Sequence, residues 1–188
     1  MRRLTAFFSV AVLILFTGSI HANMTVINFD SLAPNTIVDD QFSSLGADFN
    51  GDATVIGSLA GSFPSHSGSE VIFNFPSNNI RIDAVGPEWL MAGGYVTGTD
   101  SVTLTAYNSS DILLGAVSTI GANTVGYGTP NIFLNVSAPN IAYVEFSILS
   151  GNTFTVDDFT FNPVPVPAAV LLGMLGLGVA GLRLHKFK

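Results

Sequence analysis

Three aspartates are the side chains of this chain best suited to hold a metal ion. Asp30 follows the first predicted strand, and Asp157 and Asp158 lie within the last one. The first and last strands of a β-sandwich can lie side by side, which would bring these carboxylates together. Neighbouring strand residues point to opposite faces, so one of the pair faces the core unless a bulge intervenes. Since a buried carboxylate is costly unless paired or bound to a cation, we predict a calcium site at these residues.

Catalytic chemistry finds less support in the sequence. The chain has no cysteine, which excludes thiol catalysis, disulfides and thiolate metal sites. His66 is flanked by serines in a predicted loop, and we interpret it as a solvated loop residue rather than the base of a triad. Glu70, Glu88 and Glu145 could supply the acid pair of a glycoside hydrolase. No catalytic residue is assigned, and a secreted glycan-active hydrolase remains an alternative.

Five aromatic residues of the body could stack on a sugar, namely Trp89, Tyr95, Tyr107, Tyr127 and Tyr143, and two of them are the preferred candidates for carbohydrate binding. Trp89 and Tyr127 lie in the glycine-rich stretches 85–94 and 121–129, which we interpret as loops. Binding residues concentrate in loops that a rigid scaffold positions. Alternatively, Trp89 closes one end of the sandwich as a core residue.

The body that would position these residues, residues 23–163, is predicted to be all-β, a jelly-roll-like β-sandwich. Runs of β-branched and aromatic residues alternate with polar ones and are separated by Gly, Asn, Ser and Pro, which is typical of short antiparallel strands. Asn108–Asp111 forms the turn of the clearest hairpin. The predicted strands are 25–29, 47–50, 54–56, 70–75, 80–85, 102–107, 112–117, 132–136, 141–149 and 154–161.

Charge is distributed unevenly along the chain. All 13 carboxylates lie between residues 23 and 163, where Arg81 is the only Lys or Arg. Phosphate backbones are bound through Lys and Arg, so nucleic acid is excluded as a partner. An acidic surface of this kind suits a soluble, exported body.

Both ends of the chain carry targeting patterns. Residues 1–22 combine a basic start, an apolar run over 4–16 and a small residue, Ala22, which predicts a secretory signal peptide. Residues 164–188 contain a proline box, an apolar stretch without polar side chains over 168–182, and a basic end. The stretch is just long enough to span a membrane, with the basic end cytoplasmic. The box is Val164, Pro165, Val166, Pro167 and Ala168, and the basic tail is Arg183, Lys186 and Lys188.

This order of box, span and basic cluster resembles the PEP-CTERM sorting signal of Gram-negative bacteria. It is closer to the VPxPA variant, because Val166 occupies the position of the family's glutamate. The resemblance implies export by the Sec machinery, processing of the tail by an exosortase, and a host that makes exopolysaccharide. The body resembles jelly-roll domains found upstream of such tails and similar to carbohydrate-binding modules, through residues 27–30, 44–49 and 156–161.

These observations predict an exported, non-enzymatic protein that is first anchored through residues 168–182 and then delivered to the cell surface or extracellular matrix. Its sandwich is expected to bind polysaccharide and to associate with exopolysaccharide or biofilm. A purely structural or adhesive matrix protein without a ligand is the first alternative, and the secreted hydrolase is the second.

Overall fold

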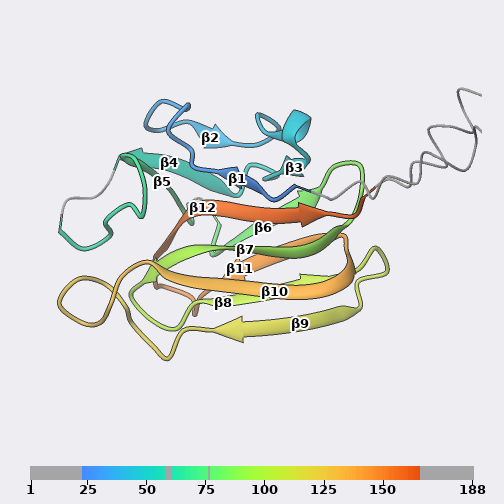
Figure 1. Cartoon of the computed structure of the whole chain (residues 1–188). Coiled ribbons are helices and arrows are strands. Elements are labelled where there is room, and N and C mark those ends of the chain that lie inside the picture. The colour runs from blue at the N-terminus through green and yellow to red at the C-terminus, as the bar shows by residue number, and fades with distance from the viewer. Residues whose placement is uncertain (1–22, 58–60, 76, 166–188) are drawn as a thin grey trace, which may run out of the picture. The chain divides into compact units, whose positions relative to one another are not determined.

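Two antiparallel β-sheets pack face to face in the computed structural model, which describes residues 23–57, 61–75 and 77–165 (Figure 1). The larger sheet contains β1 (Thr25–Ile27), β2 (Ile37–Val38), β4 (Ala53–Gly57), β5 (Glu70–Phe73), β7 (Trp89–Gly98), β10 (Ile132–Ile141) and β12 (Phe154–Pro163). The smaller contains β3 (Ala47–Asp48), β6 (Asn79–Ala84), β8 (Thr103–Tyr107), β9 (Leu113–Ser118) and β11 (Tyr143–Ser147). The predicted all-β sandwich is confirmed.

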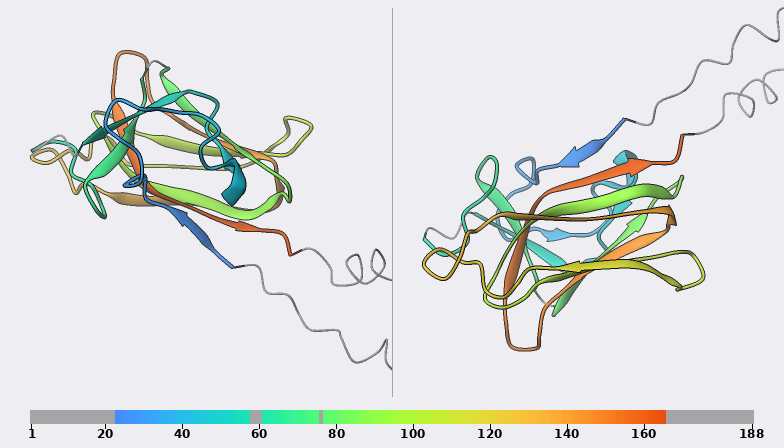
Figure 2. Two further views of the ribbon diagram at one scale, coloured as in Figure 1. Left: turned by 90° about the horizontal axis from the view of Figure 1, so that it is seen from above. Right: turned by 60° about the horizontal axis from the view of Figure 1, so that its bottom comes forward.

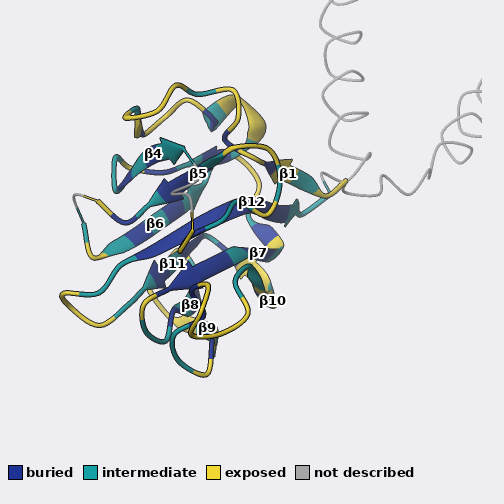
Figure 3. Cartoon of the chain, turned by 90° about the vertical axis from the view of Figure 1, so that its left-hand side faces the viewer, coloured by how far each residue is buried: buried dark blue, intermediate teal, exposed yellow. Residues whose placement is uncertain are grey.

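The strand orders are β10-β7-β12-β5-β4-β2 in the larger sheet, with β1 also paired to β12, and β3-β6-β11-β8-β9 in the smaller. A short 3-10 helix, η2 (Ser43–Leu45), precedes β3. The core fills the space between the sheets, and its buried residues follow β7 and β12 closely (Figure 3). Among the described residues, the buried members of this core lie between Ile27 and Phe161. They belong to one compact unit, Asn23–Val164, so we expect residues 23–165 to fold on their own.

β12 is the strand that organises the larger sheet. Its first half pairs with β5 and its second half with β1, whereas β7 pairs along its whole length. β1 and β12 lie side by side (Figure 2), as the sequence predicted for the first and last strands. The register to β7 shifts between Asp157 and Thr160, and Asp158 has a φ of +45°. This bulge lets both aspartates avoid the alternation that would send one of them into the core.

β7 is the strand that the sequence did not predict. Residues 89–94 were interpreted as loop because of Gly93 and Gly94, yet they form the first six of the ten residues of a central strand. A Cβ at Gly93 would overlap the carbonyl oxygen of Leu134, and one at Gly94 would lie 2.9 Å from Val156. The glycines therefore allow close contact between strands rather than a turn. The two-residue strand β2 was also missed.

Several predictions fall on residues that the structure does not describe. The signal peptide 1–22, the span 168–182, the box residues Val166 to Ala168 and the basic residues Arg183, Lys186 and Lys188 lie outside the described ranges. Of the proline box, Val164 is held by a 2.8 Å hydrogen bond from its N–H to the carbonyl of Glu88. Within residues 23–57, 61–75 and 77–165, no helix is long and apolar enough to cross a membrane.

Candidate functional site

A groove of about 390 Å³ crosses the outer face of the larger sheet. It spans β1, β12, β7 and β10, whose inward side chains build the core and whose alternate side chains point outward. The groove is lined by Met24, Val26, His66, Met91, Tyr95, Phe133, Asp158 and Thr160.

The central strand β7 supplies Met91 and Tyr95 to this groove. Positions 91, 93 and 95 of a strand share one face, so both side chains lie on the outer face. Gly93 lies between them, beside Asn135 of β10 and Thr160 of β12. It is buried and does not line the groove. The strand register thus explains why Met91 and Tyr95 meet residues of β10 and β12 on this face.

One wall of the groove is aromatic. The His66 ring stacks on Tyr95 with 3.4 Å between ring centroids and an angle of 8° between the planes. Tyr95 also contacts Phe133, its register partner in β10, at 4.9 Å between centroids. Phe133 is 38% exposed, so it offers the aromatic surface that a ligand can reach.

The other wall is aliphatic. Met24 and Val26 are 61% and 51% exposed, and Met91 lies two residues before Gly93 in β7. Val26 lies beside Thr160 across the pairing of β1 with β12. Exposed apolar side chains that gather on one face mark an interaction surface.

His66 is fixed in place by two neighbouring aspartates. Its Nδ1 lies 2.6 Å from Oδ2 of Asp158, and its backbone N–H donates to Oδ2 of Asp157 at 2.7 Å. The Ser67 N–H donates to the same Asp157 oxygen, and the Ser67 hydroxyl donates to Asp158. Since the Nδ1–H faces a carboxylate, Nε2 is the ring nitrogen that can accept a hydrogen bond from a ligand. His66 thus lies in a loop with its side chain 38% exposed, as predicted, but its ring is also fixed by a carboxylate and by Tyr95.

Asp30 holds the end of the same loop. Its Oδ1 accepts the backbone N–H of Ser69 at 2.8 Å and that of Glu70 at 3.1 Å. Together with Asp157 and Asp158, it clamps residues 66–70, which we call the clamped loop. The loop carries His66 into the groove, so the three aspartates position a wall of the site.

The calcium site predicted at Asp30, Asp157 and Asp158 stays a prediction. Among the described residues, no group of three or more His, Asp or Glu side chains is placed to hold a metal ion. The three aspartates do lie near the paired ends of β1 and β12. In the structure their carboxylates accept hydrogen bonds from backbone N–H and hydroxyl groups of the clamped loop.

Burial raises the pKa of the Asp157 carboxyl, although the N–H groups of Ser67, Asp158 and His66 oppose this by donating to it. A carboxyl whose pKa is raised on folding stabilises the folded state at pH values below its ordinary pKa of 3.8. This stabilisation is lost as the pH rises through the pKa of the folded state. We expect the stability of the wild type relative to Asp157→Asn to be greatest at about pH 3 and smaller at about pH 7. Urea unfolding at both pH values measures it, and a relative stability that grows with pH would contradict this expectation.

Gly68 is a structural requirement of the clamped loop. Its φ is +55°, and a Cβ there would overlap the Asp30 carboxylate. We expect Gly68→Ala to lower the free energy of unfolding by about 1–3 kcal/mol. Gly61→Ala is the matched control, because its φ is +112° but nothing lies within 4 Å of a Cβ. Equal losses for the two variants in urea unfolding would show that the Asp30 contact is unimportant.

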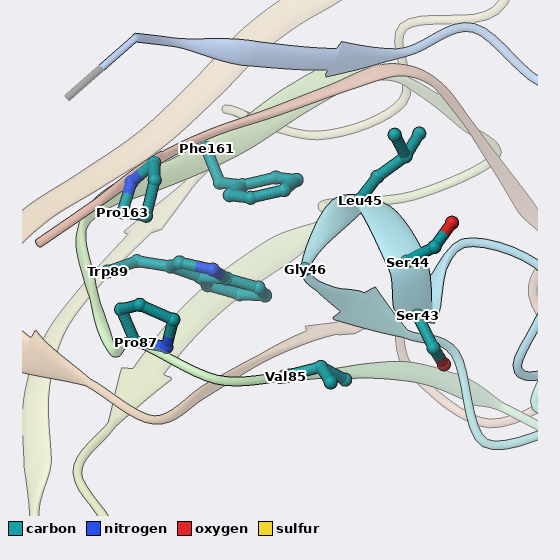
Figure 4. Close-up of a pocket in the computed structure, with 9 residues that line it drawn as sticks. All are labelled: Ser43, Ser44, Leu45, Gly46, Val85, Pro87, Trp89, Phe161 and Pro163. Atoms are coloured by element: carbon teal, nitrogen blue, oxygen red, sulfur yellow. The ribbon is translucent and has the colours of Figure 1, made fainter. Parts of the chain in front are cut away.

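A second cavity, of about 240 Å³, lies beside Trp89 (Figure 4). Trp89 is fully buried at the start of β7, with its ring 4.8 Å from that of Phe161. The prediction of a loop residue that stacks on sugar is thus corrected, and the alternative of a core residue at the end of the sandwich describes its position. Its Nε1 has no hydrogen-bond partner within the described ranges. The cavity is lined by Ser43, Ser44, Leu45, Gly46, Val85, Pro87, Trp89, Phe161 and Pro163.

The remaining sequence candidates lie elsewhere. Tyr127 is 84% exposed in its loop and lines neither cavity. Glu70 begins β5 in the larger sheet, whereas Glu145 lies in β11 of the smaller. None of the three candidate glutamates lines the groove. Of the aromatic residues that line the groove, Tyr95 is among the possible sugar-stacking residues named from the sequence, whereas Phe133 was missed, although it alternates with the core residue Leu134 in a predicted strand.

No family model matches the sequence, and no curated protein matches it either. Among solved structures, a DUF4465 family protein from Bacteroides caccae is 10% identical, with 80% of this chain and 97% of that one covered and a TM-score of 0.45. An arabinose-bound α-L-arabinofuranosidase is 14% identical, with 78% of this chain covered but only 27% of that chain, and a TM-score of 0.45. A variant of a carbohydrate binding module of family 29 is 13% identical, with 74% and 91% covered and a TM-score of 0.39. At these scores the likenesses carry no functional information.

Proposed function

We propose that the protein is a non-enzymatic glycan-binding protein and that a sugar chain lies in the groove on the outer face of the larger sheet. The observation that carries this proposal is the exposed Phe133 ring beside the stacked pair of His66 and Tyr95. Ligand sites are concave and mostly apolar, with a few fixed polar groups. The groove has this composition.

A sugar ring matches the two kinds of surface in the groove. Its C–H face is apolar and packs against an aromatic ring such as Phe133. Its hydroxyls need hydrogen-bond partners, and Nε2 of His66 supplies one within the groove. The exposed amide of Asn135, two residues from Phe133 on the same face of β10, supplies another beside it. His66 is held by Asp158 before any ligand arrives, so little conformational freedom is lost on binding.

The test is a glycan array probed with residues 23–165 in wild-type and Phe133→Ala forms. The proposal expects saturable binding by the wild type that the variant loses, without release of reducing sugar from the bound glycan. Absence of binding to every glycan would contradict it and would favour the purely structural or adhesive alternative. Release of reducing sugar would favour the hydrolase.

We also propose that this jelly-roll-like body is exported and sorted to the cell surface or extracellular matrix of a Gram-negative, exopolysaccharide-producing host. The support is the sequence alone, namely the signal-peptide pattern over 1–22 and the PEP-CTERM-like pattern over 164–188. Intact mass of the protein from its host tests this proposal. A mass that lacks 1–22 and the residues after the proline box, found in medium or matrix, is expected. A membrane-bound mass that keeps Lys188 would contradict processing by an exosortase.

A further inference from the structure

We infer that the groove selects a neutral glycan that carries acetamido groups, and discriminates against unsubstituted and acidic chains. This inference rests on the proposed function and names its ligand class. It follows from the aliphatic wall, from an unpartnered polar atom beside that wall, and from the charge of the body.

The aliphatic wall cannot satisfy a hydroxyl. Met24, Val26 and Met91 present thioether and alkyl surface to the groove, and a sugar hydroxyl placed against them would lose its water without gaining a partner. An apolar substituent on the sugar would instead bury surface there. Met91 lies four residues from Tyr95 along β7, a distance of about 13 Å in a strand. A glycan chain with one ring seated near Phe133 can therefore place the substituent of another of its rings against the methionines.

The side chain of Asn162 has an unpaired hydrogen-bond acceptor that favours an amide as the substituent. It lies beside Met91 in the register of β12 with β7, and its Oδ1 is buried with no hydrogen-bond partner within the described ranges. A buried acceptor without a donor is costly. The N–H of an acetamido group would satisfy it while the methyl group contacts Met91, whose flexible side chain can move to admit it. An O-acetyl ester has no N–H and would leave the acceptor unsatisfied.

The negative charge of the body disfavours the binding of acidic glycan chains in the groove. The stretch 23–163 holds 13 carboxylates and a single Arg or Lys, Arg81. Arg81 lies in β6 of the other sheet and is bound to Asp83 at 2.7 Å. The acid of the groove itself is Asp158, whose partner is His66. A uronic acid would therefore find no free cation among the residues that line the groove and would be repelled by the body.

The test is calorimetric titration of residues 23–165 with three β-1,4-linked hexasaccharides, namely chitohexaose, cellohexaose and a glucuronic acid hexamer. The first two share a backbone and differ in the acetamido group. We expect chitohexaose to bind at least about ten-fold more tightly than cellohexaose, and the acidic hexamer to bind most weakly. Asn162→Ala and Met91→Ala should each bring the ratio of the two neutral affinities toward one, whereas Met91→Leu should keep it. Thermal melting of each variant verifies that it is folded.

The possible results separate the two proposals. Equal affinities for chitohexaose and cellohexaose, or tighter binding of the acidic hexamer, would overturn the inference and leave glycan binding in the groove intact. An unchanged ratio in folded Asn162→Ala would overturn the role of that residue in selection. If none of the hexamers and no array glycan binds, the proposed function fails as well.

Discussion

Replacing Trp89 by alanine is expected to lower the free energy of unfolding by about 3–5 kcal/mol. The indole is fully buried and packs against Phe161 at 4.8 Å and Phe159 at 5.7 Å between ring centroids. Its loss would leave a cavity in the part of the core that joins β7 to β12. Urea unfolding of residues 23–165, followed by far-UV circular dichroism, measures the change.

Two control variants show whether the loss of stability comes from the buried indole. Leu90→Ala changes the next residue of β7, which is exposed, and should cost far less. Trp89→Phe should cost less than Trp89→Ala, because the ring contact is partly kept and the unpartnered Nε1–H is removed. A loss below about 1 kcal/mol for Trp89→Ala would mean that the indole is not the core residue described above.

Phe133→Ala is expected to weaken glycan binding at least about ten-fold, which corresponds to about 1.4 kcal/mol. The exposed Phe133 ring is the aromatic surface available to a sugar, while Tyr95 is partly covered by the stacked His66. Removing an aromatic anchor at the centre of a binding surface has the largest effect that single truncations produce. Titration with the tightest glycan of the array gives the dissociation constants.

Phe75→Ala is the matched control for this variant. Phe75 is also an exposed phenylalanine, at 61%, but it lies just after β5 and does not line the groove. Its replacement should leave the dissociation constant within about two-fold of the wild type. If Phe75→Ala weakened binding as much as Phe133→Ala, the ligand would have to lie elsewhere on the sandwich.

Local patterns were sufficient to predict much of the sandwich. Alternation of apolar and polar residues located β8 and β11, where the inward side chains belong to the core and the outward ones do not. The predicted Asn108–Asp111 turn joins β8 to β9, and the Asn108 side chain accepts the N–H groups of Ser110 and Ile112. Such short-range hydrogen bonds depend on neighbouring residues and can be inferred from a sequence.

β7 could not be predicted from local patterns because its glycines serve contacts made across the sheet. Gly93 and Gly94 are needed by Leu134 and Val156, which lie far along the chain. A sequence shows the glycines but not the strands that approach them. Since β7 carries Trp89 and Tyr95, missing this strand also misplaced the site.

The acidic residues show a similar limit. Their sequence positions correctly predicted that Asp157 and Asp158 would need compensation at the junction of β1 and β12. The compensating groups belong to His66 and Ser67, about 90 residues earlier. No local signal connects the clamped loop with the last strand, so the sequence suggested a cation and could not predict these hydrogen bonds.

The most direct test of the central claim is to map amide chemical shifts of ¹⁵N-labelled residues 23–165 during titration with the tightest glycan of the array. Binding in the groove predicts that the largest shifts cluster at Tyr95, Phe133, Thr160 and the clamped loop. These positions come from four separate segments of the chain that meet at the groove. Shifts that cluster around Tyr127, or on β6, β8 and β11 of the other sheet, would contradict the account.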